Sequence, residues 1–413
     1  MRSDVLVLGA GMVGVSAALA LQARGRTVTL ADRRGAAEET SHGNAGVIQR
    51  EAVLPYSFPR DPWVVLSYAF NRLPEAHIHR RDLTGLAPWL WRHFRHSTPE
   101  RIAATAHGAR PLIERCIDEH EALMRPAGID GMIRRTGYLR VYRSAKRLEQ
   151  DARAAIVAAE RWGTLTEPKT PTELRELEPH MTGPLAGGLL KSQAVSVGDP
   201  GGVGKAYAEL FKSRGGRFVT GDARTLEESG EGWQIGGADG PIEARRVVLA
   251  LGPWSNEVLR PLGRELPLIG KRGYHMHYSA RGNAVLTRPV LDVEGGYVLA
   301  PMSRGIRLTT GAEFANGDAQ PTPVQLAKTE PLARDLFPLG EPVDPKPWMG
   351  RRPCLPDMLP AIGPVPGKRG LWLDLGHGHL GFTLGPVSGR LLAEMMTGEA
   401  TFTDPAPYRV DRF

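Results

Sequence analysis

The stretch VLVLGAGMVGVSAALALQARGRTVTLAD, residues 5–32, decides how the rest of the chain is interpreted. Its glycines follow the order Gly-x-Gly-x-x-Gly, directly after an apolar run and before a helical pattern. An apolar run near an N-terminus is also typical of a secretion signal. That interpretation does not explain Asp4, which stands where a signal carries positive charge, and it does not explain the glycines that break the run.

The same stretch contains the pattern of a strand, a helix and a second strand. We expect the first strand over residues 5–8, the helix over 17–23 and the second strand over 27–30, closed by Asp32. An acidic residue about 20 positions after the glycines is the usual hydrogen-bond partner of a ribose. The pattern therefore predicts a βαβ unit that binds a dinucleotide.

Each glycine has a separate task in such a unit. Gly9 permits the tight turn, Gly11 lets the backbone approach a pyrophosphate, and Gly14 lets helix and strand pack closely. The N-terminus of the helix then offers free N–H groups and a partial positive charge to the phosphates. Because Asp32 suits an unphosphorylated ribose, NADP is disfavoured, while NAD and the adenosine half of FAD both remain open.

Composition excludes several classes of protein. The 413 residues include 52 basic and 45 acidic side chains, and the basic ones are scattered in short groups, which argues against a nucleic-acid groove. No stretch approaches the roughly 20 apolar residues of a membrane span. Two isolated cysteines fit neither a disulfide framework nor a zinc site. We expect a cytoplasmic protein without a metal, with at most peripheral contact at the inner face of a membrane.

The middle of the chain departs from the alternating strand and helix pattern of a nucleotide-binding fold. Residues 55–91 are irregular, aromatic and rich in proline, and we expect them to cover something. An amphipathic helix is expected over 100–125, a strand over 137–144 and a helix over 146–162. Residues 170–179 have the signals of a capped short helix.

The alternating strand and helix pattern returns in the second half of the chain. The VVLALG run at 247–252 is typical of a fully buried parallel strand, and we expect it to join the first sheet. Residues 264–316 alternate as strands without a long helix, which predicts an antiparallel sheet carrying a pocket. Residues 370–398 predict a strand, a glycine-rich turn and a terminal helix.

Taken together, these segments resemble the superfamily of D-amino acid oxidases and dehydrogenases, and within it the bacterial D-amino acid dehydrogenases and their D-hydroxyproline relatives. The resemblance covers nearly the whole chain and rests on GAGMVGVSAALALQARG, TSHGNAG (40–46), VGDPGGV, VVLALGPWS, KRGYH (271–275), YVLAPM (297–302), GRRPCLPDMLPAIG (350–363) and GHGHLGFTLGPVSGRLLAE. It implies an α/β (α+β) fold of two domains. The Rossmann-like FAD domain would comprise 1–82, 182–262 and 347–413, and a substrate domain with a mainly antiparallel sheet would comprise 83–181 and 263–346.

The resemblance also selects FAD as the cofactor. Backbone N–H groups in the turn before the last helix would stabilise the negative charge that builds at flavin N1 and O2 on reduction. Ala223 stands where the family holds adenine through the backbone of a valine. The residues expected at the cofactor are Gly9, Gly11, Met12, Val13, Gly14, Asp32, Arg33, Ser41, His42, Asn44, Ala45, Gly46, Val47, Ala223, Gly252, Trp254, Gly376, His377, Gly378, Leu380, Gly381 and Thr383.

The chemistry implied by the resemblance is hydride transfer from the alpha carbon of an amino acid or amine to flavin N5. Arg352 matches the arginine that clamps the substrate carboxylate, a task that suits the bidentate guanidinium, while its neighbour Arg351 points elsewhere. Tyr274 and Tyr297 are candidates for a second substrate contact, and His42 for a contact at the flavin.

Several alternatives stay open at this point. His275 follows Tyr274 on a strand, so only one of the two easily reaches the flavin. A glycine, sarcosine or opine oxidase would use the same clamp, and oxygen or a quinone would serve as electron acceptor. Cys354 lies where some sarcosine-oxidase relatives attach flavin, although an isolated cysteine is usually a small buried hydrophobe. Other classes are an NAD-dependent dehydrogenase, a flavin-binding regulatory protein and a tRNA-modifying flavoprotein.

Overall fold

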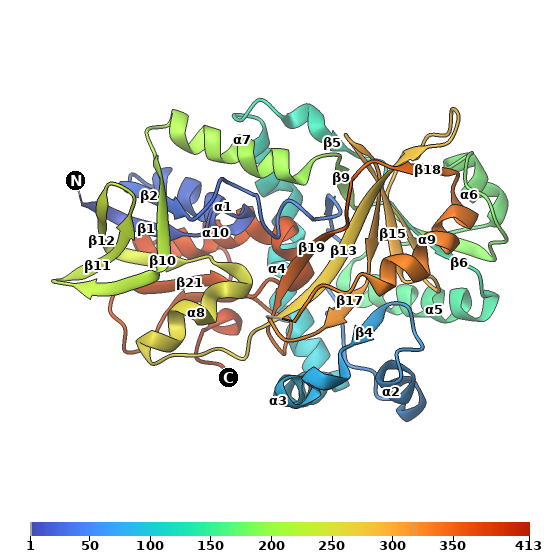
Figure 1. Cartoon of the computed structure of the whole chain (residues 1–413), viewed down its shortest axis with the longest axis horizontal. Helices are drawn as coiled ribbons and strands as arrows, with labels where there is room; N and C mark the ends of the chain where they lie inside the picture. Colours follow the sequence, from blue (N-terminus) through green and yellow to red (C-terminus); the bar gives the residue numbers. More distant parts are fainter. Residues whose placement is uncertain (1, 318) are drawn as a thin grey trace.

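A computed structural model describes residues 2–317 and 319–413, and its two large sheets lie toward opposite ends of the long axis (Figure 1). The seven-stranded sheet, here called the nucleotide sheet, has the order β1-β2-β10-β11-β12-β21-β20, and β1 also pairs with β12. Its strands are β1 (Ser3–Leu8), β2 (Val28–Asp32), β10 (Arg217–Ser229), β11 (Gly232–Gly237), β12 (Gly240–Leu249), β20 (Ala361–Pro364) and β21 (Leu371–Leu375).

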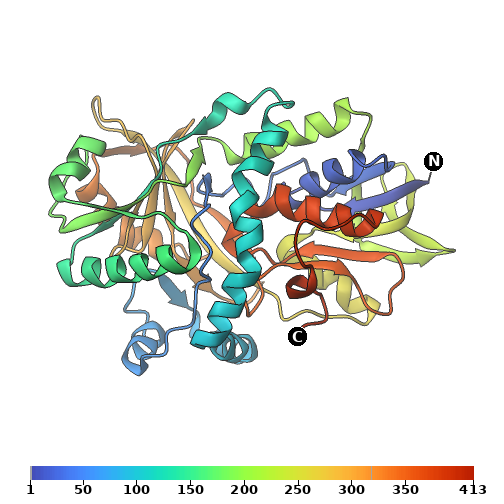
Figure 2. The same ribbon diagram turned by 180° about the vertical axis from the view of Figure 1, so that it is seen from behind.

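Helices cover the nucleotide sheet and fix the position of the glycine turns. They are α1 (Met12–Gln22), α7 (Pro200–Ser213), α8 (Ser255–Leu259) and α10 (Gly381–Thr397). A side chain at Gly389 would lie 2.7 Å from the backbone nitrogen of Ala17, so glycine is what lets α10 pack directly on α1. The long helix α4 (Pro99–Met124) runs between the two halves of the molecule, across α10 (Figure 2).

The second sheet, here called the large sheet, has eleven strands in the order β4-β17-β13-β16-β15-β14-β6-β8-β7, with β18 and β19 both paired with β13. These are β4 (Ala76–Ile78), β6 (Tyr138–Tyr142), β7 (Glu167–Lys169), β8 (Gly187–Lys191), β13 (Ile269–Ala280), β14 (Val290–Asp292), β15 (Tyr297–Met302), β16 (Gly305–Thr310), β17 (Ala312–Phe314), β18 (Leu339–Pro342) and β19 (Trp348–Cys354).

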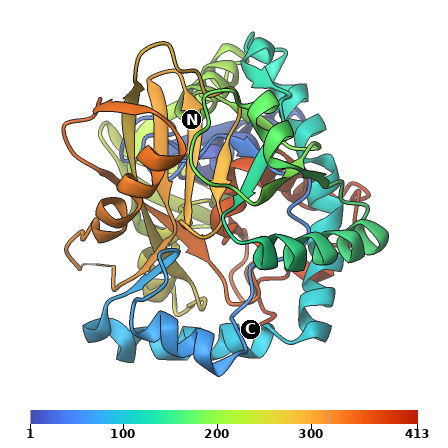
Figure 3. The same cartoon turned by 90° about the vertical axis from the view of Figure 1, so that its right-hand side faces the viewer.

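The remaining elements surround the large sheet or join the halves. Helices α5 (Ala145–Trp162), α6 (Pro171–Leu177) and α9 (Val324–Leu336) lie at its outer end, with α2 (Pro62–Ala69) and α3 (Leu83–His96) below (Figure 3). A small sheet of β3 (Val47–Ile48), β9 (Val195–Val197) and β5 (Ile133–Arg134) lies between the halves. Within the described residues, no helix combines the length and apolarity needed to cross a membrane.

Most expected elements are present. The βαβ unit, the amphipathic helix (α4), the strand β6 and the helix α5 all form within a few residues of the expected bounds. The short helix α6 begins with a capping box of Thr170 and Glu173. The VVLALG run joins the first sheet as the parallel end of β12. In contrast, the proline-rich stretch is not wholly irregular, because it forms helices α2 and α3 with prolines at positions 62 and 88.

Three strands and one helix pack across the expected domain boundaries. Strands β4, β8 and β19 fall inside the segments assigned to the FAD domain, but they pair in the large sheet. Helix α4 was expected with the substrate domain, yet its buried face joins the core beneath α1 and α10. The reason is that one β-strand or helix can pack against either half, and sequence pattern alone does not reveal which half it contacts.

Candidate cofactor and substrate site

A cavity of about 1120 Å³ lies between the nucleotide sheet and the large sheet. One side is formed by the turns that follow β1 and β21, and the other by β13 and β19. Ligands of open α/β sheets bind outside the carboxyl ends of the strands, which is where this cavity opens. Its volume exceeds the usual upper range of about 1,000 Å³ for a small-molecule pocket, so a dinucleotide and a small substrate fit together.

The three glycines of the first turn act differently. A side chain at Gly14 would lie 1.8 Å from the carbonyl oxygen of Gly9, and one at Gly9 would lie 2.5 Å from the oxygen of Ala250. These two positions therefore require glycine for packing alone, and Gly9 also has a φ of +101°. A side chain at Gly11 would meet only the hydroxyl of Ser41 at 3.3 Å, so Gly11 leaves room on the cavity side.

Asp32 and Ser41 support the same turn. The carboxylate of Asp32 accepts hydrogen bonds from the backbone of Ala10 at 2.7 Å and of Arg34 at 2.9 Å. Burial nevertheless raises the pKa of Asp32 above its ordinary value. Ser41 accepts from the backbone N–H of Met12 at 2.9 Å, so its hydroxyl takes one of the free donors at the start of α1. Both side chains are fixed before any ligand binds.

The glycine-rich turn before α10 forms the next part of the cavity. Gly376 has a φ of +84°, and a side chain there would lie 2.4 Å from Leu355. Asp374 is fully buried and lines the cavity, and its Oδ1 lies 3.3 Å from Nε2 of His377, although neither group makes a well-aligned hydrogen bond. A buried carboxylate with one imidazole neighbour and no well-aligned hydrogen bond has acceptor sites left for donors of a ligand. The ribityl and ribose hydroxyls of FAD are donors of this kind, so the residues present fit that cofactor.

The structure separates the expected cofactor residues into two groups. Those that line the cavity are Gly9, Gly11, Met12, Val13, Asp32, Arg33, Ser41, Asn44, Ala45, Val47, Ala223, Gly252, Trp254, Gly376, His377, Gly378 and Gly381. Gly14, Gly46, Leu380 and Thr383 lie behind its lining. Thr383 accepts from Gln49 N and donates to Val47 O, both at 3.3 Å, and so ties α10 to β3. These four positions hold the elements that carry the lining.

Arg352 lies in the cavity on β19 and faces β13. Its guanidinium donates to the carbonyl oxygens of Gly311 at 2.8 Å and Thr310 at 3.2 Å, and it lies over Gly273, where any side chain would clash with it. Among residues 2–317 and 319–413, no carboxylate lies within ion-pair distance of it. Burial lowers the pKa of Arg352, and its remaining N–H donors are available to a ligand.

The two expected tyrosines have their hydroxyls in the core of the large sheet. Tyr274 donates to Glu313 at 2.6 Å and accepts from the backbone of Thr322 at 2.8 Å. Tyr297 donates within 3.0 Å of both Asp292 and the carbonyl of Leu332. Both tyrosines line the cavity while their hydroxyls are satisfied within the large sheet, so a substrate contact by either one stays a prediction.

His42 also departs from the expectation of a role at the flavin. It is not among the residues that line the cavity, and its imidazole packs toward Gly201 and Trp348. His275 lines the cavity in its place, stacked on Trp348 at 4.8 Å. Tyr274 also lines the cavity, but its hydroxyl is directed at Glu313 within the large sheet. Burial lowers the pKa of His275 to about 2, so it is neutral.

Sequence reasoning missed three further side chains in this part of the cavity. Lys271 lies directly opposite Arg352 in the β13–β19 pairing. His379 lies in the turn before α10, with its ring 4.6 Å from that of Tyr56, and burial lowers its pKa to about 3. Strand alternation could have identified Lys271, because it shares a face with His275. Tyr56 comes from the proline-rich stretch, which covers the cavity as expected.

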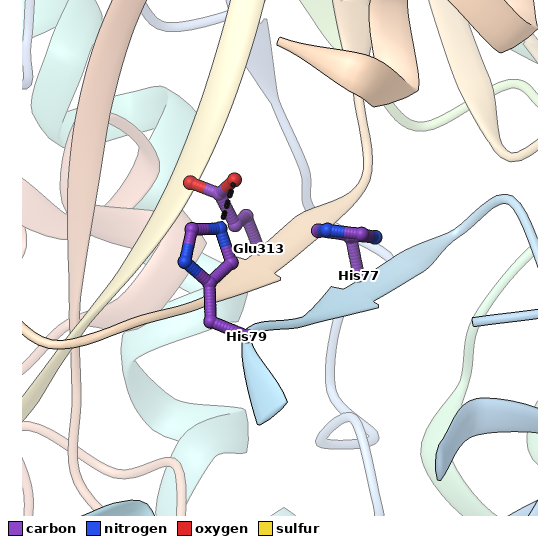
Figure 4. Close-up of side chains that lie close together, drawn as sticks. All are labelled: His77, His79 and Glu313. Carbon is purple, nitrogen blue, oxygen red and sulfur yellow. Dashed lines mark hydrogen bonds and ion pairs between the residues drawn. The ribbon is translucent and has the colours of Figure 1, made fainter. Parts of the chain in front are cut away.

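A trio of His77, His79 and Glu313 joins β4 to β17 and has ligand atoms within 4.8 Å of one another. Figure 4 shows His79 directed at Glu313, with Nε2 and Oε1 3.0 Å apart, while His77 lies to one side. Glu313 also accepts from Tyr274 and Thr322. Tetrahedral zinc would need ligand atoms about 3.4 Å apart. The trio is better described as a hydrogen-bonded connection between the two strands.

Comparisons with known proteins agree with this geometry. A family model described as FAD dependent oxidoreductase matches residues 4–395. The D-amino acid dehydrogenase of Paramagnetospirillum magneticum is 33% identical, with 99% of this chain and 98% of that protein covered. The D-amino-acid oxidase of Bradyrhizobium diazoefficiens is 28% identical, with 99% and 98% covered.

Solved structures share the fold at lower identity. Glycine oxidase from Geobacillus kaustophilus has a TM-score of 0.75 and 22% identity, covering 100% of this chain and 99% of the other. L-proline dehydrogenase from P. horikoshii has a TM-score of 0.76 and 18% identity, with 100% and 98% covered. These similarities extend over both sheets.

Proposed function

The chain belongs to the family of FAD-dependent oxidoreductases, and we propose that it oxidises the Cα–N bond of a small D-amino acid or a cyclic secondary amine such as D-hydroxyproline. The observation that carries the proposal is Arg352, a cation in the cavity with free donors and no carboxylate partner among the described residues. A bidentate guanidinium matches a carboxylate, which every amino acid supplies. The named relatives, a D-amino acid dehydrogenase and a D-amino-acid oxidase, support the same substrate class.

We assign the cofactor to the glycine side of the cavity. The open backbone at Gly11 and the N-terminus of α1 suit the pyrophosphate, and Asp32 suits the ribose hydroxyls. Asp374, whose Oδ1 lies 3.3 Å from Nε2 of His377, would offer its remaining acceptor sites to further hydroxyl groups. Bound FAD supplies the hydride acceptor for oxidation of the Cα–N bond to an imine.

The residues of the chain would bind and orient the substrate and adjust its protonation. Arg352 fixes the carboxylate, which limits the rotation of the Cα–H bond relative to the cavity. The amine must be neutral when it is oxidised. Lys271 and Arg352 both place positive charge in the cavity, and nearby positive charge lowers the pKa of an ammonium group. Substrate binding here would therefore favour loss of the ammonium proton to solvent.

Anaerobic reduction tests the proposal. The purified protein is loaded with FAD, and its visible spectrum is followed while D-alanine, D-proline, D-hydroxyproline, glycine, sarcosine and their L-enantiomers, where these exist, are added. We expect bleaching by D-amino acids or D-imino acids and little change with L-enantiomers. A protein that binds FAD and is bleached by none of these compounds would contradict the proposal. Reoxidation in air, compared with reoxidation by a quinone, then identifies the electron acceptor.

A further inference from the structure

Lys271 is a basic side chain that the binding of a single substrate carboxylate by Arg352 does not require. It lines the cavity, and its ammonium lies 4.7 Å from the centre of the Trp89 ring and 5.3 Å from that of Phe314. Within the part of the chain that the structure describes, its Nζ makes no hydrogen bond and no ion pair. Aromatic faces stabilise a cation partly, but they leave its three donors unused.

The position of Lys271 adds to the free-energy cost of leaving its donors unused. It stands directly across from Arg352 in the antiparallel pairing of β13 with β19, and like charges directly opposite each other destabilise a sheet. Neither cation contacts a carboxylate among residues 2–317 and 319–413. The neighbouring imidazoles of His93 and His379 have pKa values lowered by burial to about 4 and about 3, so they are neutral. This end of the cavity therefore holds two basic side chains with no compensating carboxylate among the described residues.

One substrate carboxylate compensates only one of these charges. The planar fork of Arg352, held by two backbone carbonyls, suits the alpha carboxylate, as argued above. The compact ammonium of Lys271 suits an anion of less defined geometry on a flexible side chain. Burial and the neighbouring Arg352 lower the pKa of Lys271, and a bound anion would reverse that effect.

We propose that Lys271 forms a subsite for a second anionic group, so that the favoured substrate is a D-amino acid with a carboxylate or comparable acid on its side chain. This inference rests on the proposed function, because it assumes that Arg352 holds the alpha carboxylate. Phe314, which lines the cavity, would pack against the methylene groups between the two acids, while Trp89 contacts Lys271 from outside the lining. The side-chain acid thus completes the charge balance of the cavity.

The kinetic test compares substrates that differ in charge and hardly in shape. D-aspartate is paired with D-asparagine and D-glutamate with D-glutamine, and kcat/KM is measured for the FAD-loaded enzyme. For at least one pair we expect the acid to exceed the amide by tenfold or more. Lys271→Met should abolish that ratio, and Lys271→Arg should retain most of it. Lys191→Met is the matched control, since Lys191 lines the same cavity but already donates to Thr166 at 2.7 Å.

Binding without turnover separates this inference from the proposed function. Succinate and propionate are titrated against the visible spectrum and the melting temperature of the FAD-loaded protein. We expect the wild type to bind succinate at least tenfold more tightly than propionate. Lys271→Met should bind the two compounds equally. An acid-to-amide ratio near one, or equal losses for acid and amide in Lys271→Met, would overturn the inference. If no amino acid reduces the flavin, the proposed function fails, while the succinate comparison still decides on Lys271.

Discussion

On the nucleotide side of the cavity the shape is set by glycines and backbone groups, whereas on the β13–β19 side it is set by charged side chains. Gly9 and Gly14 are fixed by distances to neighbouring backbone that leave no room for a methyl group. Lys271 and Arg352 are instead fixed by their place on two paired strands. The comparison suggests that substitutions on the first side affect folding or cofactor retention, and that substitutions on the second side affect substrate use.

The largest expected effect is that of Arg352→Ala. Removing one partner of a buried charge pair costs about 3 to 5 kcal/mol, so kcat/KM for a D-amino acid should fall a hundredfold or more. FAD content should remain near that of the wild type. Arg351→Ala is the matched control, because Arg351 is the next residue of β19 and its side chain points away from the cavity. Equal losses of kcat/KM in both variants would show that Arg352 supports the fold of β19 and does not bind the substrate.

The second effect concerns Asp32 on the nucleotide side. Asp32→Ala removes a hydrogen bond to a charged acceptor, so FAD should dissociate more readily, with a loss of roughly 1.5 to 3 kcal/mol in binding free energy. Equilibrium dialysis of the FAD-free protein against FAD measures the change. Asp4→Ala serves as the control for local stability, because Asp4 lies in β1 outside the cavity lining and its carboxylate accepts from the hydroxyl of Thr27. Unchanged FAD affinity in Asp32→Ala would remove Asp32 from the cofactor site.

The third prediction uses the contrast between two glycines of one turn. Gly14→Ala forces a methyl group to within 1.8 Å of the Gly9 oxygen, and overpacking of this kind costs about 1 to 3 kcal/mol, so thermal stability should fall even without FAD. Gly11→Ala meets only the Ser41 hydroxyl and should weaken FAD binding with little change in the stability of the FAD-free protein. Differential scanning calorimetry with and without FAD distinguishes the two. Identical behaviour of both variants would contradict the separate roles.

The last prediction is a pH dependence of stability that arises outside the cavity. Burial lowers the pKa of His120 to about 4, below its ordinary value, so below about pH 6.5 the unfolded chain binds a proton that the folded chain does not. This contribution is present above pH 6.5 and is lost as pH falls toward 4, by up to about 1.4 kcal/mol per pH unit. His120→Gln should reduce the slope of unfolding free energy against pH, and His107→Gln, an exposed residue of the same helix, should not.

The extent of sequence-based prediction follows the same division between the two sides. The glycine turns, the buried strands and α10 could be predicted because each depends on local constraints of spacing and apolar periodicity. The assignment of β8 and β19 to a sheet could not be made, because strand partners are chosen by tertiary packing. The hydrogen-bond partners of the Tyr274 and Tyr297 hydroxyls could not be predicted either, since they come from distant segments of the chain.

The central claim is that Arg352 holds the carboxylate of an amino acid substrate, and one measurement addresses it directly. Flavin reduction is followed anaerobically with a D-amino acid and with its decarboxylated amine, in the wild type, Arg352→Lys and Arg352→Ala. The amine should be a poor substrate for the wild type, and its rate of flavin reduction should change little in either variant. The rate with the amino acid should fall in Arg352→Lys, which loses the planar fork, and fall further in Arg352→Ala, which also loses the charge. If Arg352→Ala leaves amino acid oxidation intact, or impairs both compounds equally while FAD stays bound, the carboxylate clamp is contradicted.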